Sequence, residues 1–251
     1  MLTDLISQEN LSLFNNATFG EEINQTYGLF MCRGDLNATQ CYDCVVEATE
    51  TIFDKCPTQK EALVWFNECM IRYSNRNIFS LYEEAPMVYS WSSINVSNPQ
   101  VFGEVYATTV DGLIMEAAYD TSSGGYAAGE ANVTEFESVY VLAQCTPDIV
   151  GSRCERCLRV ALRNMGGCCG TARTFLAMYM PSCWLRYDQL PIVAGKPPNA
   201  PFVLWDNMPS FESNNSSSSS MPPSLGNLFL SKTLLHFLRT FFFFGKLART
   251  T

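Results

Sequence analysis

Apolar positions recur with helical spacing in two stretches of the chain. The first lies in residues 41–52, and its apolar face consists of Cys41, Cys44, Val45, Ala48 and Ile52. The second lies in residues 154–165 and repeats the pattern with Cys154, Cys157, Leu158, Ala161, Leu162 and Met165. This spacing predicts an amphipathic helix in each stretch, with two cysteines on its buried face.

A pair of apolar segments follows each predicted helix. Residues 61–73 (EALVWFNECMIRY) follow the first helix, and residues 173–187 (RTFLAMYMPSCWLRY) follow the second. Short apolar runs of this kind, bounded by polar residues, predict strands. Residues 102–119 (FGEVYATTVDGLIMEAAY) open the second unit and fit either a helix or a strand. Each unit is therefore predicted to run strand, helix, strands.

The two units are copies of one pattern. The segments CRGDLNATQCYDC (residues 32–44) and CTPDIVGSRCERC (residues 145–157) share the spacing C-x8-C-x2-C. Five cysteines match at an offset of 113 residues at the start and 114 at the end: Cys32, Cys41, Cys44, Cys56 and Cys69 with Cys145, Cys154, Cys157, Cys169 and Cys183. Asp35, Arg72 and Tyr73 also match, with Asp148, Arg186 and Tyr187. An internal repeat of this length predicts two tandem domains.

Charge and glycosylation acceptors indicate where the protein works. The 251 residues carry a formal net charge of -9 without a basic cluster, which argues against a nucleic-acid partner. Asn-x-Ser/Thr acceptors are frequent: Asn10, Asn16, Asn24, Asn37, Asn95 and Asn132, with Asn214 and Asn215 in a later Ser-rich run. This density is typical of a secreted glycoprotein.

The N-terminal sequence does not fit that compartment. The first residues, MLTDLISQENLSLF, have neither the basic start nor the apolar core of a secretory signal peptide. A disulfide-rich glycoprotein needs such a signal, so the sequence suggests a fragment or a truncated gene product.

Three chemistries are open to the clustered cysteines. Zinc requires four thiolate or imidazole ligands, and the only histidine, His236, lies far outside the repeats. A redox C-x2-C pair has no third cysteine bonded to it, whereas here a cysteine precedes each pair at the same distance. In an extracellular protein structural disulfides fit best, and the sequence predicts no metal and no cofactor.

The C-terminal region differs in composition. Residues 193–224 are Pro- and Ser-rich and are predicted to be a linker, and residues 225–251 form an apolar tail interrupted by Lys232, His236 and Arg239. That tail is open to three interpretations: a membrane span, an interfacial segment, or neither. The predicted domains are therefore residues 1–82 and 99–192, joined by a linker at 83–98.

These motifs carry a family resemblance. The tandem C-x8-C-x2-C, with YGLFMCRGD, GEANVTEFESVYVLAQCTPD and PSCWLRYDQLP, resembles the plant ginkbilobin-2-homologous, or stress-antifungal, domain. Tandem copies are similar to the ectodomains of cysteine-rich receptor-like protein kinases and to cysteine-rich repeat secretory proteins. The resemblance implies an α+β fold, in which each domain is an antiparallel sheet packed with helices and held by disulfides.

The resemblance also implies a cysteine pairing. Cys32 is expected to pair with Cys41, Cys44 with Cys69, Cys145 with Cys154 and Cys157 with Cys183. In the family, Cys56 pairs with a cysteine of an N-terminal strand that has no counterpart in this sequence, so a reduced thiol is expected at Cys56. The adjacent Cys168 and Cys169 form a disulfide with each other or pair otherwise.

A non-catalytic extracellular binding module in plant stress or defence is the function that the resemblance implies. The related receptors continue into a Ser/Thr kinase, but this sequence lacks the glycine-rich loop and catalytic motifs of a kinase. Asp35 and Asp148 suit a loop or cap role better than catalysis. Arg33-Gly34-Asp35 matches an adhesion tripeptide in its letters only. The protein is expected outside the cell or on the outer face of the plasma membrane.

Two ligand classes are open. Family members bind mannose through an Asn, an Arg and an acid; here the Asn has no counterpart, the Arg position falls near Leu63 and Leu176, and the acidic position falls at Ser74 and Asp188. The alternatives are a protein module that engages a co-receptor, such as a receptor-like kinase, and a truncated product without function. The aromatic residues outside the repeats suit either the domain interface or a partner surface: Tyr89, Trp91, Trp205 and Phe211.

Overall fold

The computed structural model describes residues 5, 12–21, 24–169, 173–192 and 203–204. The predicted linker end and tail, residues 205–251, lie outside this part, as do Asn10, Asn214 and Asn215. Within the described part, no helix combines the length and the apolar character that crossing a membrane requires.

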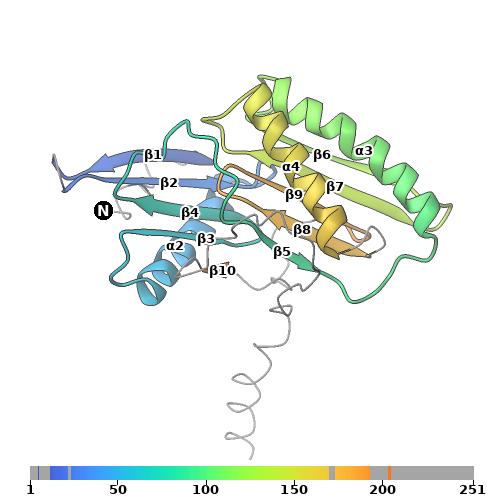
Figure 1. The fold of residues 1–251 in the computed structure, drawn as a ribbon, viewed down its shortest axis with the longest axis horizontal. Helices are drawn as coiled ribbons and strands as arrows, with labels where there is room; N and C mark the ends of the chain where they lie inside the picture. The colour runs from blue at the N-terminus through green and yellow to red at the C-terminus, as the bar shows by residue number, and fades with distance from the viewer. Residues whose placement is uncertain (1–4, 6–11, 22–23, 170–172, 193–202, 205–251) are drawn as a thin grey trace, which may run out of the picture. The chain divides into compact units, whose positions relative to one another are not determined.

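The first repeat forms a five-stranded antiparallel sheet with the order β1-β2-β4-β3-β10. Its strands are β1 (Phe14–Phe19), β2 (Thr26–Cys32), β3 (Glu61–Trp65), β4 (Cys69–Ser74) and β10 (Val203–Leu204). Helix α2 (Ala38–Lys55) packs on one face of this sheet, over β4, β3 and β2 (Figure 1). Asn37 caps α2, because its side chain accepts a hydrogen bond from the Gln40 backbone N–H at 2.9 Å.

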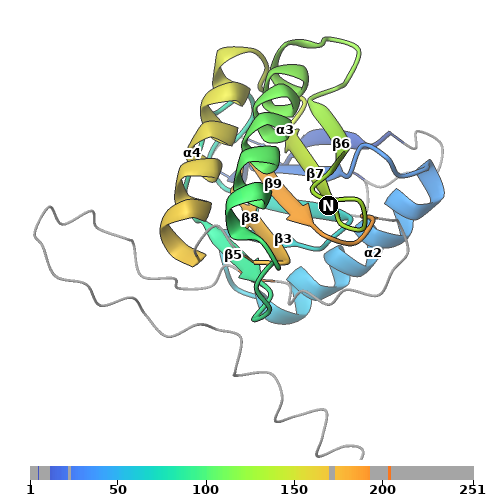
Figure 2. The ribbon, with the colours of Figure 1, turned by 90° about the vertical axis from the view of Figure 1, so that its right-hand side faces the viewer.

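The second repeat forms another five-stranded antiparallel sheet, with the order β5-β8-β9-β7-β6. Its strands are β5 (Val88–Trp91), β6 (Tyr126–Asn132), β7 (Ser138–Cys145), β8 (Phe175–Tyr179) and β9 (Cys183–Asp188). Helices α3 (Pro99–Tyr119) and α4 (Ser152–Cys169) lie side by side on one face (Figures 1 and 2). The ambiguous stretch 102–119 is therefore helical, and the predicted α+β class of two antiparallel sheets with helices is confirmed.

Three apolar cores hold these layers together. Cys41, Cys44, Val45, Ala48 and Ile52 of α2 are buried against the first sheet, as the helical spacing predicts. The second core joins α3 and α4 to the second sheet. The third core contains the opposite faces of both sheets: Leu29, Met31, Leu63, Trp65 and Met70 from the first, with Leu142, Ala177, Tyr179 and Trp184 from the second. The two repeats therefore share buried surface.

Both predicted linkers contain a strand. In residues 83–98, β5 pairs with β8, because its alternating apolar residues Val88, Tyr89 and Trp91 contact buried surface on both faces of the second sheet. In residues 193–224, Val203 and Leu204 of β10 pair with β3. The Ser-rich composition that predicts a flexible linker begins only at Ser213, beyond β10.

Candidate interaction sites

Each repeat contains the same two disulfides. Cys32–Cys41 and Cys145–Cys154 join the end of a strand to the helix that follows, across 9 residues of sequence. Cys44–Cys69 and Cys157–Cys183 tie the next turn of each helix to the sheet, across 25 and 26 residues. These pairs coincide with those that the family resemblance implies. The buried helix face therefore carries covalent links to the sheet in both copies.

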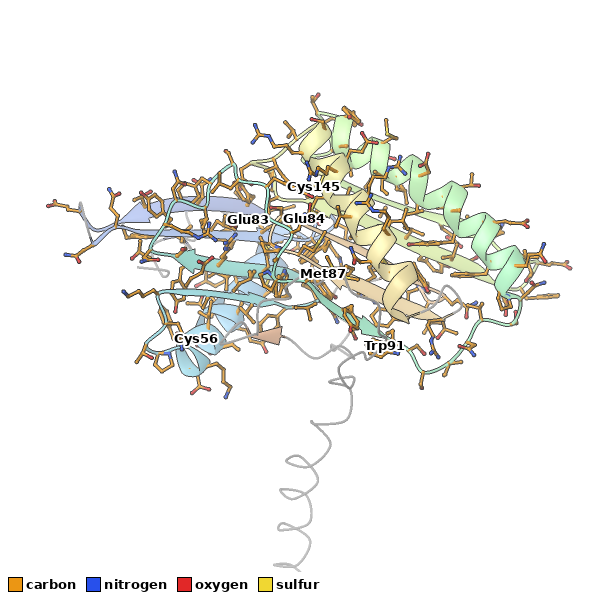
Figure 3. The ribbon with its side chains drawn as sticks, in the orientation of Figure 1. Cys56, Glu83, Glu84, Met87, Trp91 and Cys145 are labelled. Atoms are coloured by element: carbon orange, nitrogen blue, oxygen red, sulfur yellow. A yellow bond between two sulfur atoms is a disulfide. The ribbon has the colours of Figure 1, made fainter. Side chains whose placement is uncertain are left out.

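The remaining cysteines lie near the ends of the helices. Cys56 follows α2 and is buried, at 2% exposure, in the core of the first repeat (Figure 3). Cys168 and Cys169 lie in the last turn of α4, and their side chains are outside the described part of the chain. The expected pairing of Cys168 and Cys169 stays a prediction.

The Arg33-Gly34-Asp35 tripeptide is part of the contact between the repeats. Arg33 is 2% exposed, and its Nε donates to Asp35 Oδ1 at 2.6 Å. Gly34 lies so close to Tyr126 of β6 that a Cβ at this position would be 2.4 Å from Tyr126 Cγ. Burial, with the nearby Asp35 carboxylate, raises the pKa of Tyr126 to about 12. The tripeptide is therefore a packing element, and its arginine does not reach solvent.

Gln144 of β7 is the polar centre of this contact. Its Nε2 donates to the Cys32 carbonyl at 2.8 Å, and its Oε1 accepts from the Gly34 N–H and from Trp184 Nε1, both at 3.2 Å. Gln144 is 3% exposed, so these bonds satisfy polar groups that water does not reach. We did not predict this residue. The sequence does contain a signal for it: the repeat aligns Gln144 with the apolar Met31 of the first copy, so a polar residue stands at a position that is apolar in the other copy.

The segment between the repeats crosses the start of α4. Asp148 accepts a hydrogen bond from the Ser80 N–H at 2.7 Å, and Arg153 donates to the Ser80 carbonyl at 2.8 Å. The guanidinium of Arg156 lies 5.2 Å from the centre of the Tyr82 ring, an attractive cation–π geometry. Asp148 thus holds a loop, which agrees with the structural role predicted for it.

Four charged residues join the same segment to the first sheet. Glu61 accepts from Arg72 at 2.6 Å and from Arg76 at 2.9 Å. Glu83, labelled in Figure 3, pairs with the same two arginines. Burial of Glu61 opposes its ionisation, but the hydrogen bonds and charges of Arg72 and Arg76 outweigh burial and lower the pKa of Glu61. Arg72 is nearly buried, at 4% exposure, so this network compensates a charge that has little access to water.

The second repeat surrounds the matching arginine differently. Arg186 pairs with Asp188 at 3.1 Å, and its guanidinium carbon lies 5.0 Å from the centre of the Phe175 ring. The repeat aligns Phe175 with Glu61 and Asp188 with Ser74. Each copy therefore keeps an arginine–acid pair, but the acid comes from β3 in the first copy and from β9 in the second.

The positions that align with sugar-binding residues of the family have other roles in this fold. Leu63 and Leu176, which fall near the arginine position, are both 1% exposed. Ser74, at the acidic position of the first repeat, is also fully buried. Only Asp188 is a partly exposed acid, and it is already paired with Arg186. The geometry thus brings no Asn, Arg and acid together at these positions.

The described glycosylation acceptors all lie on the surface. Their asparagines, on β1, the β1–β2 turn, the start of α2, the segment after β5 and the end of β6, are exposed: Asn16, Asn24, Asn37, Asn95 and Asn132. Asn37 uses its side-chain oxygen to cap α2, which leaves its amide nitrogen as the atom that would carry a glycan. Their occupancy stays a prediction.

Exposed apolar side chains gather around the start of α4. Tyr119 and Val150 are 49% and 68% exposed, and the Gly151 N–H beside Val150 donates to the Ala118 carbonyl beside Tyr119. Leu81, 44% exposed, follows Ser80, whose carbonyl is bound by Arg153. In contrast, Tyr89 and Trp91 are half-buried and pack on the core of the second repeat. Trp205 and Phe211 lie outside the described residues.

Comparison with known proteins identifies the family. The salt stress response/antifungal family matches residues 1–76 and 92–190, which contain both repeats, and the chain belongs to this family. Cysteine-rich repeat secretory protein 8 of Arabidopsis thaliana is 35% identical over 79% of this chain and 74% of its own length. Cysteine-rich receptor-like protein kinase 25 of the same plant is 39% identical over 72% of this chain, a match that spans only 27% of the kinase.

A solved structure supports the fold. The tandem DUF26 ectodomain of the Arabidopsis thaliana cysteine-rich receptor-like protein PDLP8 superimposes with a TM-score of 0.65, covering 75% of this chain and 85% of that ectodomain. At 22% identity this similarity concerns the fold alone. The predicted resemblance to tandem stress-antifungal domains is confirmed.

Proposed function

We propose that this chain is a non-catalytic, extracellular recognition module that acts in plant stress or defence responses. The observation that carries the proposal is the pair of matching disulfides in each repeat of a stress response/antifungal fold. Four disulfides, at two equivalent positions in each repeat, are typical of an oxidising compartment. The exposure of all five described glycosylation acceptors agrees with that compartment.

We further propose a protein ligand, with the apolar cluster formed by Leu81, Tyr119 and Val150 as its contact surface. Apolar side chains that lie together on a surface and are rimmed by charges are typical of protein-binding sites. Arg153, Arg156 and Glu155 supply that rim at the start of α4. A carbohydrate is the second candidate, and Arg186 with Asp188 is the arginine–acid pair that would favour it.

Binding measurements separate the two ligand classes. The full chain, secreted through a heterologous signal, is applied to arrays of purified plant receptor ectodomains and of plant and fungal glycans. The proposal predicts saturable binding to an ectodomain that Val150→Glu abolishes. Ile94→Glu is the matched control, because Ile94 is as exposed as Val150, at 66%, and should leave binding unchanged.

Other outcomes contradict the proposal at distinct points. Glycan binding that survives Val150→Glu and is lost with Asp188→Asn would show that the ligand is a sugar and not a protein. A secreted product that retains reduced thiols at the eight paired cysteines would contradict the extracellular assignment itself.

A further inference from the structure

The two sheets are completed by strands from different places in the sequence. The repeat aligns β1, β2, β4 and β3 with β6, β7, β9 and β8, so β10 occupies beside β3 the position that β5 occupies beside β8. Strand β5 precedes its own repeat, whereas β10 follows both repeats. The edge of the first sheet is therefore covered by a segment from beyond the second (Figure 1).

The register of the two pairings is the same. Val203 lies opposite Trp65 and Leu204 opposite Val64, while Val88 lies opposite Tyr179 and Tyr89 opposite Met178. The offset of 114 residues that relates Cys69 to Cys183 also relates Trp65 to Tyr179 and Val64 to Met178. Val203 thus takes the place of Val88, residue for residue, on the equivalent strand.

The sequence repeats this relationship independently of the strand pairing. Residues 85–89 read Ala-Pro-Met-Val-Tyr and residues 200–204 read Ala-Pro-Phe-Val-Leu, with a tryptophan close behind in each case. In Figure 3, Met87 directly precedes β5 and Trp91 is its last residue. The shared pattern Ala-Pro-x-Val-x followed by Trp is therefore the kind of strand that this edge of each sheet accepts.

The edge of β3 that pairs with β10 belongs to a buried strand. Strand β5 faces Tyr179 through Leu176 of β8, whereas β10 faces only Trp65 and Val64 of the equivalent stretch of β3. The side chains of β3 from Ala62 to Trp65 are buried on both faces of the sheet, at 0–3% exposure. The edge of a strand that is buried on both faces is a template for pairing with an extended segment, and in the described residues β10 is that segment.

We propose that the edge of β3 is a binding site for an extended segment of the Ala-Pro-x-Val type, which β10 of this chain occupies in cis through Val203 and Leu204. Backbone hydrogen bonds to β3 supply the affinity, and the apolar positions of the segment supply the specificity. Because β10 follows both repeats in the chain and is not part of the first repeat, a matching strand offered in trans can take its place. This inference does not depend on the ligand proposed above.

The test combines a strand-breaking variant with hydrogen exchange on the full chain. Successive N–H groups of a strand point to opposite sides, so V203P/L204P removes whichever one donates to β3. We expect amides of β3 to exchange about tenfold faster or more in this variant. Amides of β8, which β5 covers, are the internal control and should keep their protection. V203D is a second, milder variant in case two prolines impair folding.

A labelled peptide tests the site directly. The peptide of residues 198–208, PNAPFVLWDNM, should bind the V203P/L204P protein, and the same peptide with both prolines should not. The peptide of residues 85–92, APMVYSWS, should bind as well, since it carries the same pattern. The wild-type chain should bind either peptide at least about tenfold more weakly, because its own segment competes.

Three results would overturn the inference. Unchanged exchange at β3 in both variants would show that β10 does not cover this edge. Absence of peptide binding to a variant with exposed β3 would show that the edge is no acceptor site. A wild-type dimer that the double-proline variant converts to a monomer would show that a second copy donates the strand, and occupancy in cis would be wrong.

Discussion

The side chain of Gln144 in the second repeat donates a hydrogen bond to the carbonyl of Cys32 in the first, at 2.8 Å. This bond connects the ends of two equivalent strands, since Cys32 closes β2 and Gln144 stands one residue before the end of β7. The same side chain accepts from Gly34 and Trp184. One buried amide thus fixes the position of one repeat against the other.

Replacement of Gln144 should loosen this contact. Gln144→Leu leaves the Cys32 carbonyl, the Gly34 N–H and Trp184 Nε1 without their partner, and we expect it to lower the free energy of unfolding by about 3 kcal/mol. Urea unfolding followed by tryptophan fluorescence measures the loss. Gln100→Leu, at an exposed position of α3, is the control and should change stability by less than about 0.5 kcal/mol. Equal effects of the two would show that Gln144 does not organise the contact.

Two glycine-to-alanine substitutions should change stability in opposite directions, one through close packing and the other through helix propensity. Gly34→Ala places a Cβ 2.4 Å from Tyr126 Cγ, and we expect a loss of about 1–3 kcal/mol. Gly112→Ala introduces the same methyl group into α3 where, apart from its own helix backbone and chain neighbours, no atom lies within 4 Å, so it should stabilise the protein by about 0.5–1 kcal/mol. Thermal unfolding of both variants checks the opposite signs. A stabilising Gly34→Ala would contradict the close approach of the repeats.

The disulfides should contribute according to the loops they close. The Cys44–Cys69 disulfide closes a loop of 25 residues and the Cys32–Cys41 disulfide a loop of 9. Replacing Cys44 and Cys69 by alanine should therefore lower the free energy of unfolding by about 1 kcal/mol more than replacing Cys32 and Cys41. The reason is that a longer loop gains more entropy in the unfolded chain. Denaturant unfolding of both double variants measures the difference. The second repeat offers an independent check with Cys157–Cys183 and Cys145–Cys154.

The ion-pair network predicts a specific pH dependence. The pKa of Glu61 is lower in the folded protein than its ordinary value of 4.5, so Glu61 stabilises the fold above that pH and loses this effect as the pH falls through its folded pKa. Glu61→Gln should therefore cost about 1–2 kcal/mol at pH 7, and the difference from wild type should shrink below pH 4.5. Glu50→Gln, at an exposed position of α2, is the control. A difference that grows in acid would contradict the network.

Most helices and strands can be predicted from the sequence because the side chains that they bury recur at a regular spacing of apolar residues. The apolar face of α2 runs from Cys41 to Ile52 at helical spacing, and these side chains are buried as expected. The long stretch at 102–119 was ambiguous because it is apolar on several sides, and packing against both β6 and α4 makes it a helix. The repeat accounts for four strands of each sheet, since matching segments adopt matching strands, but not for the edge strands β5 and β10.

The contacts between the repeats were not predictable from periodicity. Arg33 belongs to a tripeptide that looks like a surface motif, yet it is buried because Asp35 neutralises it and Tyr126 covers Gly34. The average composition of residues 193–224 predicts a linker and hides the short strand pattern at Val203 and Leu204. Comparison of the two copies position by position, rather than by composition, reveals both Gln144 and Val203.

The most direct test of the account is a disulfide and glycan map of the chain secreted from plant cells, made by mass spectrometry of non-reduced peptides. We predict four linked pairs, Cys32–Cys41, Cys44–Cys69, Cys145–Cys154 and Cys157–Cys183, together with glycans on the exposed acceptors such as Asn37 and Asn95. Links within the C-x2-C pairs, such as Cys41–Cys44, or reduced cysteines with bare asparagines, would contradict an extracellular recognition module held together by disulfides.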